Sequence, residues 1–524
     1  MIRRIIITAS AMLLSVVSIM AQNPYMPLWE HIPDGEPYIF EDPDNPGSYR
    51  VYVYGSHDSL IEYYCGREQV VWSAPVDDLD DWRCDGVVFE SKLDRDGRQL
   101  NGDGVGDVLY APDITERVEN GEKVYYFYPN VQSDERGTLI ARGLRPDGPF
   151  TVFNWDPADP RRTVGVFGFD PAAFIDDDGR VYGYWGFGRS YGAELDPVTM
   201  ASVKPGCEVV EDMVSGMDDE GVFHFFEASS MRKIKDKYVF IYSRKSPAEE
   251  FGLDRSNNNL AYAYSDHPLG PWTYGGVLVD ARGRDFDVNG NPVATAIPFG
   301  NTHGSILEIN GQWWVFYHRQ TGTDQYSRQA MVAPITVEVE EGPGGKVKIS
   351  EAEVTSEGFR IEGLDPLEKS SAGWACWFSN PDGWTEEFPE FFFTGSYVKA
   401  SRPGDEEPLC PVINNTAGSV VGFKYFNFDR TSGAGKVSLK ADFKPEGISG
   451  TVTVFVGGPG RKQGGTKICR FKISASSPLE MREYVARARK LGRFCGKQPL
   501  FFVFDSKTKG RSLCEFYDFQ FCLE

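Results

Sequence analysis

Acidic side chains in this 524-residue chain recur beside very small residues, at the start of short apolar stretches. A carboxyl group beside Gly, Ala or Ser leaves room for a ligand, and two such groups can donate and accept a proton during a reaction. Four of the five clusters contain an Asp or Glu, and the fifth contains a His. These residue types favour general acid–base chemistry. The clusters begin at Gly35, Ala111, Asp170, Glu227 and His303.

A repeated pair of strands must position each cluster. Every cluster is followed by a turn rich in Gly, Asn or Asp and then by an alternating strand with many aromatic residues. Equivalent aromatics of these strands lie 73, 57, 56 and 75 residues apart, at Tyr52, Tyr125, Tyr182, Tyr238 and Trp313. This spacing is typical of the blades of a β-propeller, whose innermost strands line one central channel. We therefore expect an all-β fold with five blades, in which the five clusters converge.

Cleavage of a glycosidic bond requires such a convergence of carboxyl groups. One carboxylic acid protonates the leaving oxygen, and a second carboxylate activates water or attacks the sugar. A third acidic group nearby can keep the pKa of the acid high. Because the clusters offer all three, the sequence indicates a glycoside hydrolase with an oligosaccharide or polysaccharide substrate.

The motifs, in the order in which they occur, resemble glycoside hydrolase family 43, whose members are five-bladed propellers. The resemblance covers roughly Asn23 to Thr336 and implies an inverting, single-displacement enzyme. It favours α-L-arabinofuranosidase or β-xylosidase activity, exo-acting or debranching, on plant-type polysaccharide. The motifs are YVYGSHD at Tyr52–Asp58, YAPDI at Tyr110–Ile114, FDPAAFIDDDGRVYGYWG at Phe169–Gly186, FFEASSMRKIKDKYVFIYS at Phe225–Ser243, SDHPLGPW at Ser265–Trp272 and NTHGSILEINGQWWVFYHR at Asn301–Arg319.

The resemblance also implies roles for single residues. Glu227 looks like the general acid, and Asp170 like the residue that tunes the pKa of that acid and orients it. His303 looks like the central histidine beneath the sugar, and Arg328 like an arginine aimed into the same pocket. Trp185 is expected either to stack on a sugar or to pack inside a blade. No cofactor is required, and a structural Ca²⁺ near the propeller centre, bound to His303 through water, is the metal that we consider.

The general base is where the chain departs from the family pattern. Relatives typically read Ala-Asp-Pro at the start of the first inner strand, whereas this chain reads Pro33-Asp34-Gly35-Glu36-Pro37. Alignment of the repeats places Glu36 opposite Asp170, because both precede a proline and a strand. Alternatively, Asp34 keeps the usual residue type and, in an extended strand, would point to the same side as Glu36. Both remain candidates.

A second domain is expected after the propeller. Short strands with Gly and Pro turns follow Ala372, which is typical of a β-sandwich. This region is similar to carbohydrate-binding module family 6. The predicted organisation is a signal peptide at residues 1–21, the propeller at 22–340, a connecting segment at 341–370 and the sandwich at 371–524.

Composition and the N-terminus restrict partners and location. Arg3 and Arg4 precede an apolar run from Ile5 to Met20, which is typical of a secretory signal peptide and is too short to span a bilayer comfortably. We therefore expect export to the periplasm or the medium, without a membrane span. The net charge of −22 argues against nucleic acid as a partner.

Three alternatives remain at this point. A propeller that has lost its base would bind sugars without cleaving them, as a lectin does. The unusual base could mark a subgroup that acts on galactan. A retaining enzyme that acts on fructosyl groups would need a carboxylate pair about 5 to 5.5 Å apart, and its usual Arg-Asp-Pro motif is absent.

Overall fold

The computed structural model describes residues 22–60, 63–132, 136, 138–287, 290–380, 383–402, 405 and 409–524. The predicted signal peptide lies outside the described residues. Within them, regular structure consists of strands and five single-turn 3₁₀ helices, at Glu250–Gly252, Ala372–Trp374, Asp429–Thr431, Arg461–Gln463 and Leu491–Arg493. No helix in this part of the chain is long and apolar enough to cross a membrane.

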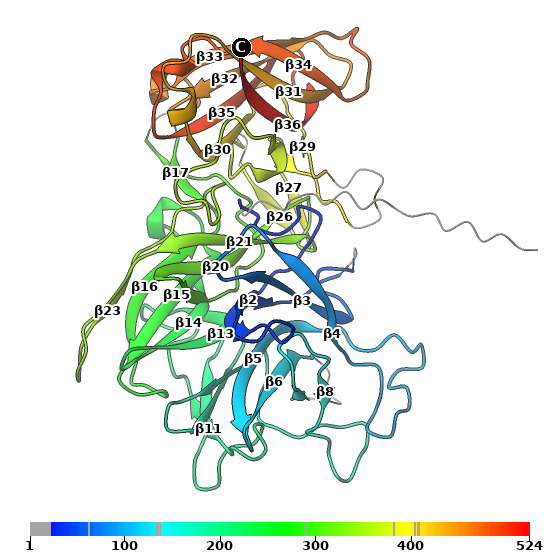
Figure 1. Cartoon of the computed structure of the whole chain (residues 1–524), viewed down its shortest axis with the longest axis vertical. Coiled ribbons are helices and arrows are strands. Elements are labelled where there is room, and N and C mark those ends of the chain that lie inside the picture. Colours follow the sequence, from blue (N-terminus) through cyan, green and yellow to red (C-terminus); the bar gives the residue numbers. More distant parts are fainter. Residues whose placement is uncertain are drawn as a thin grey trace, which may run out of the picture.

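Five antiparallel sheets follow one another along the first part of the chain (Figure 1). In each sheet, strands that are consecutive in sequence lie side by side. Their bounds are β1 Glu36–Glu41, β2 Tyr49–Tyr54, β3 Glu68–Pro75 and β4 Arg83–Glu90; β5 Tyr110–Glu119, β6 Glu122–Asn130, β7 Ala141–Gly143 and β8 Thr151–Val152; β9 Ala172–Ile175, β10 Val181–Trp185, β11 Tyr191–Leu195 and β12 Val210–Glu211; β13 Phe225–Ile234, β14 Lys237–Ser246, β15 Ser256–Ser265 and β16 Thr273–Asp280; and β19 Ile306–Ile309, β20 Gln312–Gln320 and β21 Arg328–Ile335.

The first strands of these sheets form a closed ring. Strand β1 contacts β5 and β19, and β9 contacts β5 and β13. Arg232 of β13 closes the ring by donating from Nε to the carbonyl oxygen of Ile306 on β19, at 3.1 Å. A backbone bridge between Gly35 and Gly304 joins the first sheet to the last. The ring places the start of every inner strand around one axis, as the repeat spacing predicts.

Burial on both faces explains the aromatic middle strands. Nearly every residue of β6, β10 and β14 is buried, because each sheet packs between two neighbours. Large rings such as Tyr125, Phe127 and Tyr184 fill these interfaces. Burying a side chain of this size contributes about 1.5–3 kcal/mol, so the inter-sheet packing holds the inner strands in fixed positions.

Two further sheets form the C-terminal part, at the opposite end of the long axis of the molecule (Figure 1). Buried and partly buried residues alternate along most of β31 and β36, so one face of each strand is the more fully covered. The two covered faces share one core that includes Phe423, Phe443, Phe502 and Phe516. One sheet contains β24 Ser370–Ser371, β28 Tyr397–Val398, β29 Val412–Ile413, β31 Val437–Pro445, β34 Arg482–Arg487 and β36 Cys514–Leu523; the other contains β25 Trp377–Phe378, β30 Val420–Asn427, β32 Gly450–Val456, β33 Thr466–Ile473 and β35 Lys497–Ser506.

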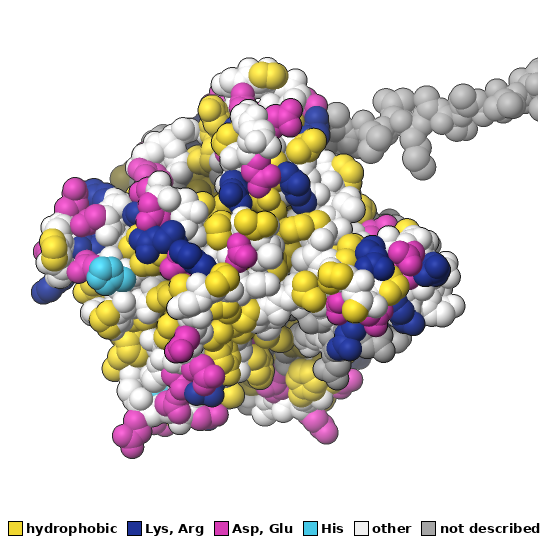
Figure 2. All heavy atoms as spheres, turned by 90° about the horizontal axis from the view of Figure 1, so that it is seen from below, with side chains coloured by type: hydrophobic (Ala, Val, Ile, Leu, Met, Phe, Trp, Pro, Cys, Tyr) yellow, Lys and Arg dark blue, Asp and Glu magenta, His cyan; other side chains and the backbone are white. Residues whose placement is uncertain are grey.

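In the described part of the chain, three two-stranded hairpins lie outside these sheets. The hairpins are β17 Arg284–Phe286 with β18 Pro292–Ala294, β22 Val337–Val339 with β23 Val347–Ile349, and β26 Thr385–Glu387 with β27 Glu390–Phe392. Trp377 and Phe501 of the C-terminal sheets share a core with strands of the fourth and fifth sheets. The face seen in Figure 2, at the end away from the C-terminal sheets, carries acidic side chains interspersed with Lys and Arg.

Candidate active site

The ring brings four of the predicted residues to one buried point. His303 Nδ1 lies 3.7 Å from Asp170 Oδ2 and 3.9 Å from Asp34 Oδ1, and His303 Nε2 lies 4.0 Å from Glu36 Oε1. Burial lowers the pKa of His303 to about 4, so its imidazole is neutral at neutral pH. The two candidate bases therefore lie at opposite edges of one uncharged ring.

The backbone at Asp34 separates it from Glu36. Asp34 has a φ of 62°, in the left-handed region that Asp tolerates better than most residues. The backbone is therefore not extended at Asp34, and the two carboxyl groups meet different nitrogens of His303. The preceding segment passes so close to β2 that a Cβ at Gly55 would lie 2.2 Å from the carbonyl oxygen of Pro33, so this approach requires glycine.

Hydrogen bonds and a cation keep Asp34 ionised. Ser56 Oγ donates to Asp34 Oδ2 at 2.6 Å, and Arg328 Nη1 donates to Asp34 Oδ1 at 3.1 Å. The backbone N–H of Asp34 donates to His318 Nδ1 at 3.2 Å. Burial opposes ionisation, but Arg328 and the neighbouring donors hold the pKa of Asp34 below its ordinary value. Arg328 is itself fixed by Asp58, with Nη2 2.9 Å from Oδ1.

Glu227 has different surroundings in the same buried cluster. Asn301 Nδ2 donates to Glu227 Oε1 at 2.5 Å, and no cation forms an ion pair with this carboxyl group among the described residues. Burial raises the pKa of Glu227 to about 7, and the charge of Asp34 adds to the effect. Asn301 Oδ1 faces Arg328 Nη1 at 3.5 Å, so one amide side chain links the surroundings of both carboxyl groups.

Asp170 lies beside His303 and contacts the backbone next to Glu227. It accepts hydrogen bonds from Asn130 Nδ2 and from the backbone N–H of Ala228, both at 3.0 Å. Burial and the neighbouring charges of Glu227 and Asp34 raise the pKa of Asp170 well above its ordinary value. Asp170 and Ala228 both have positive φ, 48° and 67°. Strained backbone of this kind costs about 1–3 kcal/mol per residue and concentrates at functional sites.

Glu36 belongs to a second cluster, on the far side of His303. Arg232 Nη2 donates to Glu36 Oε2 at 2.8 Å, and Ser230 Oγ donates to the same oxygen at 3.1 Å. The Arg232 guanidinium lies 4.5 Å from the ring centre of Tyr38, whose hydroxyl donates to Asp113 at 2.6 Å. Burial raises the pKa of Glu36 to about 7 despite Arg232. Arg232 thus holds the carboxyl groups of the first two clusters, that of Glu36 directly and that of Asp113 through Tyr38.

The surroundings of His303 do not provide an inner shell for a metal. Within the described residues, no group of three His, Cys, Asp or Glu side chains could hold an ion. Glu36 Oε1 is buried without a hydrogen-bond partner and faces His303 Nε2 across 4.0 Å, but Arg232 already supplies positive charge to this carboxyl group. A Ca²⁺ at this point would depend on water for most of its ligands. No chemical step below uses one.

Trp185 does not face the site. Only 6% of its surface is exposed, and its ring stacks on Tyr191 at 5.9 Å and meets Phe167 edge-on at 5.5 Å. It lies in the core shared by the second and third sheets. These contacts favour packing in the core for Trp185 and give no support to the alternative that it stacks on a sugar.

Other aromatic residues lie next to Asp170 and Glu227 in the chain. Phe169 and Phe226, the neighbours of Asp170 and Glu227 in the chain, each lie 5.1 Å from Phe187, which is 53% exposed. Phe187 therefore presents a ring to solvent beside the segment that carries Glu227. Its position in the turn after β10 is the only signal in the sequence that could have identified it.

Two asparagines were also missed by sequence reasoning. Asn301 begins the NTHGS segment that contains His303, and Asn130 ends β6. Each donates to a buried carboxyl group, Glu227 and Asp170 respectively. Their only sequence signal is a polar residue at a strand end on the side of the clusters, and many loop residues share that property.

Comparison with known proteins gives the same family as the motifs. The model of Glycosyl hydrolases family 43 matches residues 40–342. A xylosidase/arabinosidase of Thermoclostridium stercorarium is 34% identical over 429 residues, which are 77% of this chain and 82% of that protein. A β-xylosidase of Xylanibacter ruminicola is 28% identical over 296 residues, 47% of this chain and 82% of that protein.

A solved structure with similar coverage is that of a family 43 arabinoxylan arabinofuranohydrolase from Bacillus subtilis in complex with cellotetraose. It covers 96% of this chain and 97% of its own, with 20% identity and a TM-score of 0.45. The family match covers more than half of the sequence, and the first relative extends it over most of the chain. The protein belongs to glycosyl hydrolases family 43 and is a glycosidase that hydrolyses O-glycosyl bonds.

Proposed function

We propose that the protein is an inverting β-xylosidase or α-L-arabinofuranosidase, with Glu227 as general acid and Asp34 as general base. One observation carries this proposal. Two buried carboxyl groups in one pocket have opposite pKa shifts, downward for Asp34 and upward to about 7 for Glu227. Pairs with divergent pKa values are the usual basis of acid and base assignments in such enzymes.

In this mechanism Asp34 removes a proton from a water molecule while the water oxygen attacks the anomeric carbon. The bond between that carbon and the leaving oxygen breaks, and Glu227 transfers its proton to the leaving oxygen. Arg328 stabilises the ionised form of Asp34 before the reaction. Inversion follows because the attacking water and the leaving group lie on opposite faces of the sugar.

Asp170 supports the acid in this proposal. The charge of Glu227 raises the pKa of Asp170, so the two neighbouring carboxyl groups resist being ionised together. Asp170 also fixes the backbone immediately after Glu227 through the N–H of Ala228. His303 would lie beneath the sugar as a neutral ring.

Asp34 is preferred to Glu36 because of what each carboxylate contacts. Glu36 is held by Arg232 and Ser230 behind His303, whereas Asp34 shares Arg328 and Asn301 with the surroundings of Glu227. Glu36 meets the edge of His303 opposite to Asp170, which contacts the segment of Glu227, so Glu36 is poorly placed to share a water and a sugar with that acid.

The substrate assignment is supported by the names of the relatives. Besides the two proteins above, an arabinoxylan arabinofuranohydrolase of Paenibacillus polymyxa is 27% identical over 311 residues, 55% of this chain and 44% of that protein. We further infer that the ring of sheets at residues 22–340 is a five-bladed β-propeller and that residues 371–524 form a β-sandwich similar to carbohydrate-binding module family 6. Export by the predicted signal peptide would place the enzyme outside the cytoplasm.

Hydrolysis of aryl arabinofuranosides, xylosides and galactosides tests the proposal. We expect turnover of the first two and, by NMR of the first-formed sugar, the anomer opposite to that of the substrate. Retention of configuration would contradict the mechanism, and sugar binding without turnover of any substrate would favour the lectin alternative.

A further inference from the structure

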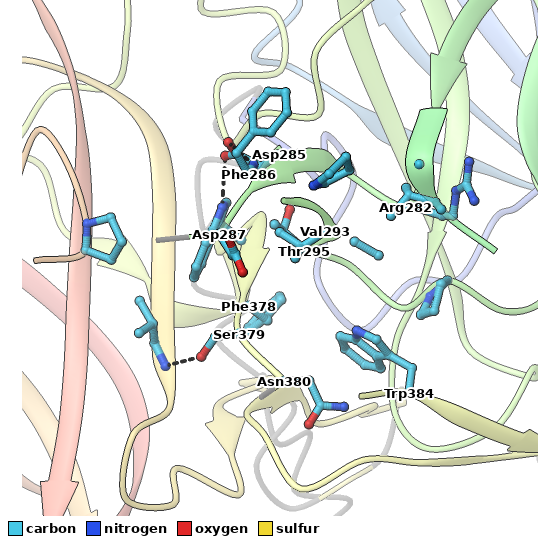
Figure 3. Close-up of a pocket in the computed structure, with 18 of the residues that line it drawn as sticks. Arg282, Asp285, Phe286, Asp287, Val293, Thr295, Phe378, Ser379, Asn380 and Trp384 are labelled. Atoms are coloured by element: carbon cyan, nitrogen blue, oxygen red, sulfur yellow. Dashed lines mark hydrogen bonds between the residues drawn. The ribbon is translucent and has the colours of Figure 1, made fainter. Parts of the chain in front are cut away.

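A cavity of about 1260 Å³ lies between the ring of sheets and the C-terminal sheets, away from the carboxyl groups described above. One wall comes from the loops around β17 and β18 and from the segment between β14 and β15. The other comes from β25, the turn before β26 and the loops of the second C-terminal sheet. Figure 3 shows Phe286 and Trp384 on opposite sides of this cleft. We call it the interdomain cleft.

The interdomain cleft opens at the catalytic end of the fourth sheet. Glu227, near the start of β13, pairs with Ser243 near the end of β14, and Ser246 pairs with Ser256 at the start of β15. The segment between β14 and β15 therefore leaves the sheet at the end where Glu227 lies, and it lines the cleft. Phe299 also lines the cleft, two residues before Asn301, which donates to Glu227.

The interdomain cleft is lined by aromatic rings and by acidic and basic side chains in similar numbers. Phe286 is 65% exposed, and Trp384 and Tyr425 are half-buried. Asp285 accepts from Lys424 Nζ at 2.9 Å and from Trp377 Nε1 at 3.0 Å. Paired charges leave little net field for an ionic ligand, whereas exposed rings beside polar groups suit the faces and hydroxyls of neutral sugars.

We propose that the interdomain cleft binds the main chain of a neutral polysaccharide substrate while one of its residues or branches enters the catalytic pocket. This inference rests on the proposed function, because it takes the same polymer to be the substrate. The cleft exceeds the roughly 300–1,000 Å³ of a typical small-molecule pocket, so it has room for several sugar rings. Substrate would then contact both parts of the chain.

The test separates polymer binding from catalysis. Phe286→Ala, Trp384→Ala and the double variant are made in full-length protein, and Tyr49→Ala, which removes a 49% exposed ring on β2 outside the cleft, is the matched control. Affinity for soluble arabinoxylan is measured in the Glu227→Gln background so that the polymer is not cut. Hydrolysis of an aryl arabinofuranoside, which is too small to reach the cleft, is measured with Glu227 intact.

We expect the double variant to bind arabinoxylan about tenfold more weakly, as is typical when central aromatic contacts are truncated, with aryl-glycoside kcat/KM within about twofold of the parent. Unchanged affinity in all three variants, or an equal loss in Tyr49→Ala, would overturn the inference. Because Phe286 is largely exposed, its single variant keeps the test valid if Trp384→Ala does not fold. Failure of the proposed function would instead abolish aryl-glycoside turnover in the parent enzyme.

Discussion

The assignment of the base makes a sharp prediction about two neighbouring carboxylates. Asp34→Asn and Glu36→Gln each remove one negative charge and keep the shape of the side chain. Both residues are buried beside His303, at 3.9 and 4.0 Å from its two nitrogens. The two variants are therefore matched in burial, in isosteric replacement and in distance from the centre. They differ in one respect: Asp34→Asn removes the proposed base, and Glu36→Gln does not.

The contacts of each residue set the expected magnitudes. Loss of a general base lowers the rate roughly 10²- to 10⁴-fold, which is about 3–5 kcal/mol of transition-state free energy. Asp34→Asn should show this loss and still fold, because Arg328 keeps its ion pair with Asp58 at 2.9 Å. Glu36→Gln should keep kcat/KM within about tenfold and instead lose up to about 3 kcal/mol of unfolding free energy, because it breaks the buried pair with Arg232.

The assay is kcat/KM on an aryl xyloside and an aryl arabinofuranoside, with urea unfolding of both variants. Azide provides a second measurement. In Asp34→Gly a small anion can occupy the space of the carboxylate and attack the anomeric carbon, so we expect restored turnover and a glycosyl azide of inverted configuration. A 10²-fold or larger loss in Glu36→Gln together with an active Asp34→Asn would refute the reasoning from contacts and make Glu36 the base.

Three further predictions follow from the same environments. The alkaline limb of the pH profile of kcat/KM should lie near pH 7, because activity needs protonated Glu227 and is lost as pH rises through its raised pKa. The acidic limb should lie below the ordinary pKa range of a carboxyl group, because Asp34 stays ionised down to its lowered pKa. A pH profile checks both, and an alkaline limb unchanged in Glu227→Gln would contradict the assignment. Glu227→Gln should lose roughly 10²- to 10⁴-fold on arabinoxylan but much less on a dinitrophenyl glycoside, whose leaving group needs no proton; equal losses on both would argue against an acid role. Arg232→Met should lower the unfolding free energy by about 3–5 kcal/mol, because it leaves Glu36 buried without its cation. The control Arg180→Met, at an exposed pair with Asp178, should change the unfolding free energy by less than about 0.5 kcal/mol. Equal urea midpoints for the two variants would show that the buried pair is not stabilising.

Periodicity made the ring of sheets predictable. The aromatic strands at Tyr52, Tyr125, Tyr182, Tyr238 and Trp313 lie on β2, β6, β10, β14 and β20, the second strand of each of the five sheets. Spacing carries this information because each sheet buries both faces, so every repeat must supply the same rings at the same place. Convergence of the clusters follows from ring closure alone.

The choice between Asp34 and Glu36 could not be predicted in the same way. Repeat alignment favoured Glu36, and the Asp34 alternative assumed an extended strand through both residues, whereas Asp34 has a positive φ and the two carboxyl groups meet different nitrogens of His303. What separates them is Arg328, almost 300 residues further along the chain, and Arg232 on the fourth sheet. A local pattern holds no information on which distant cation each carboxylate will meet. The same reason explains why Trp185 was ambiguous and why Asn301 was missed.

The roles of base and acid are separated by the position of one cation, Arg328, which lies closer to Asp34 than to Glu227. Arg328 donates to Asp34 at 3.1 Å but meets Glu227 through the Asn301 amide, so the guanidinium lowers the pKa of Asp34, whereas burial outweighs its effect on the pKa of Glu227. Once Asp34 is ionised, its charge raises the pKa of Glu227 and of Asp170 further. The base therefore helps to keep the acid protonated before substrate binds. Loss of Arg328 should bring the pKa values of Asp34 and Glu227 closer together. A variant such as Arg328→Met is expected to move the two limbs of the pH profile toward each other, by raising the pKa of Asp34 more than that of Glu227. A profile in which only the alkaline limb moved would show that the cation acts on Glu227 directly and that Asn301 is not the link between them.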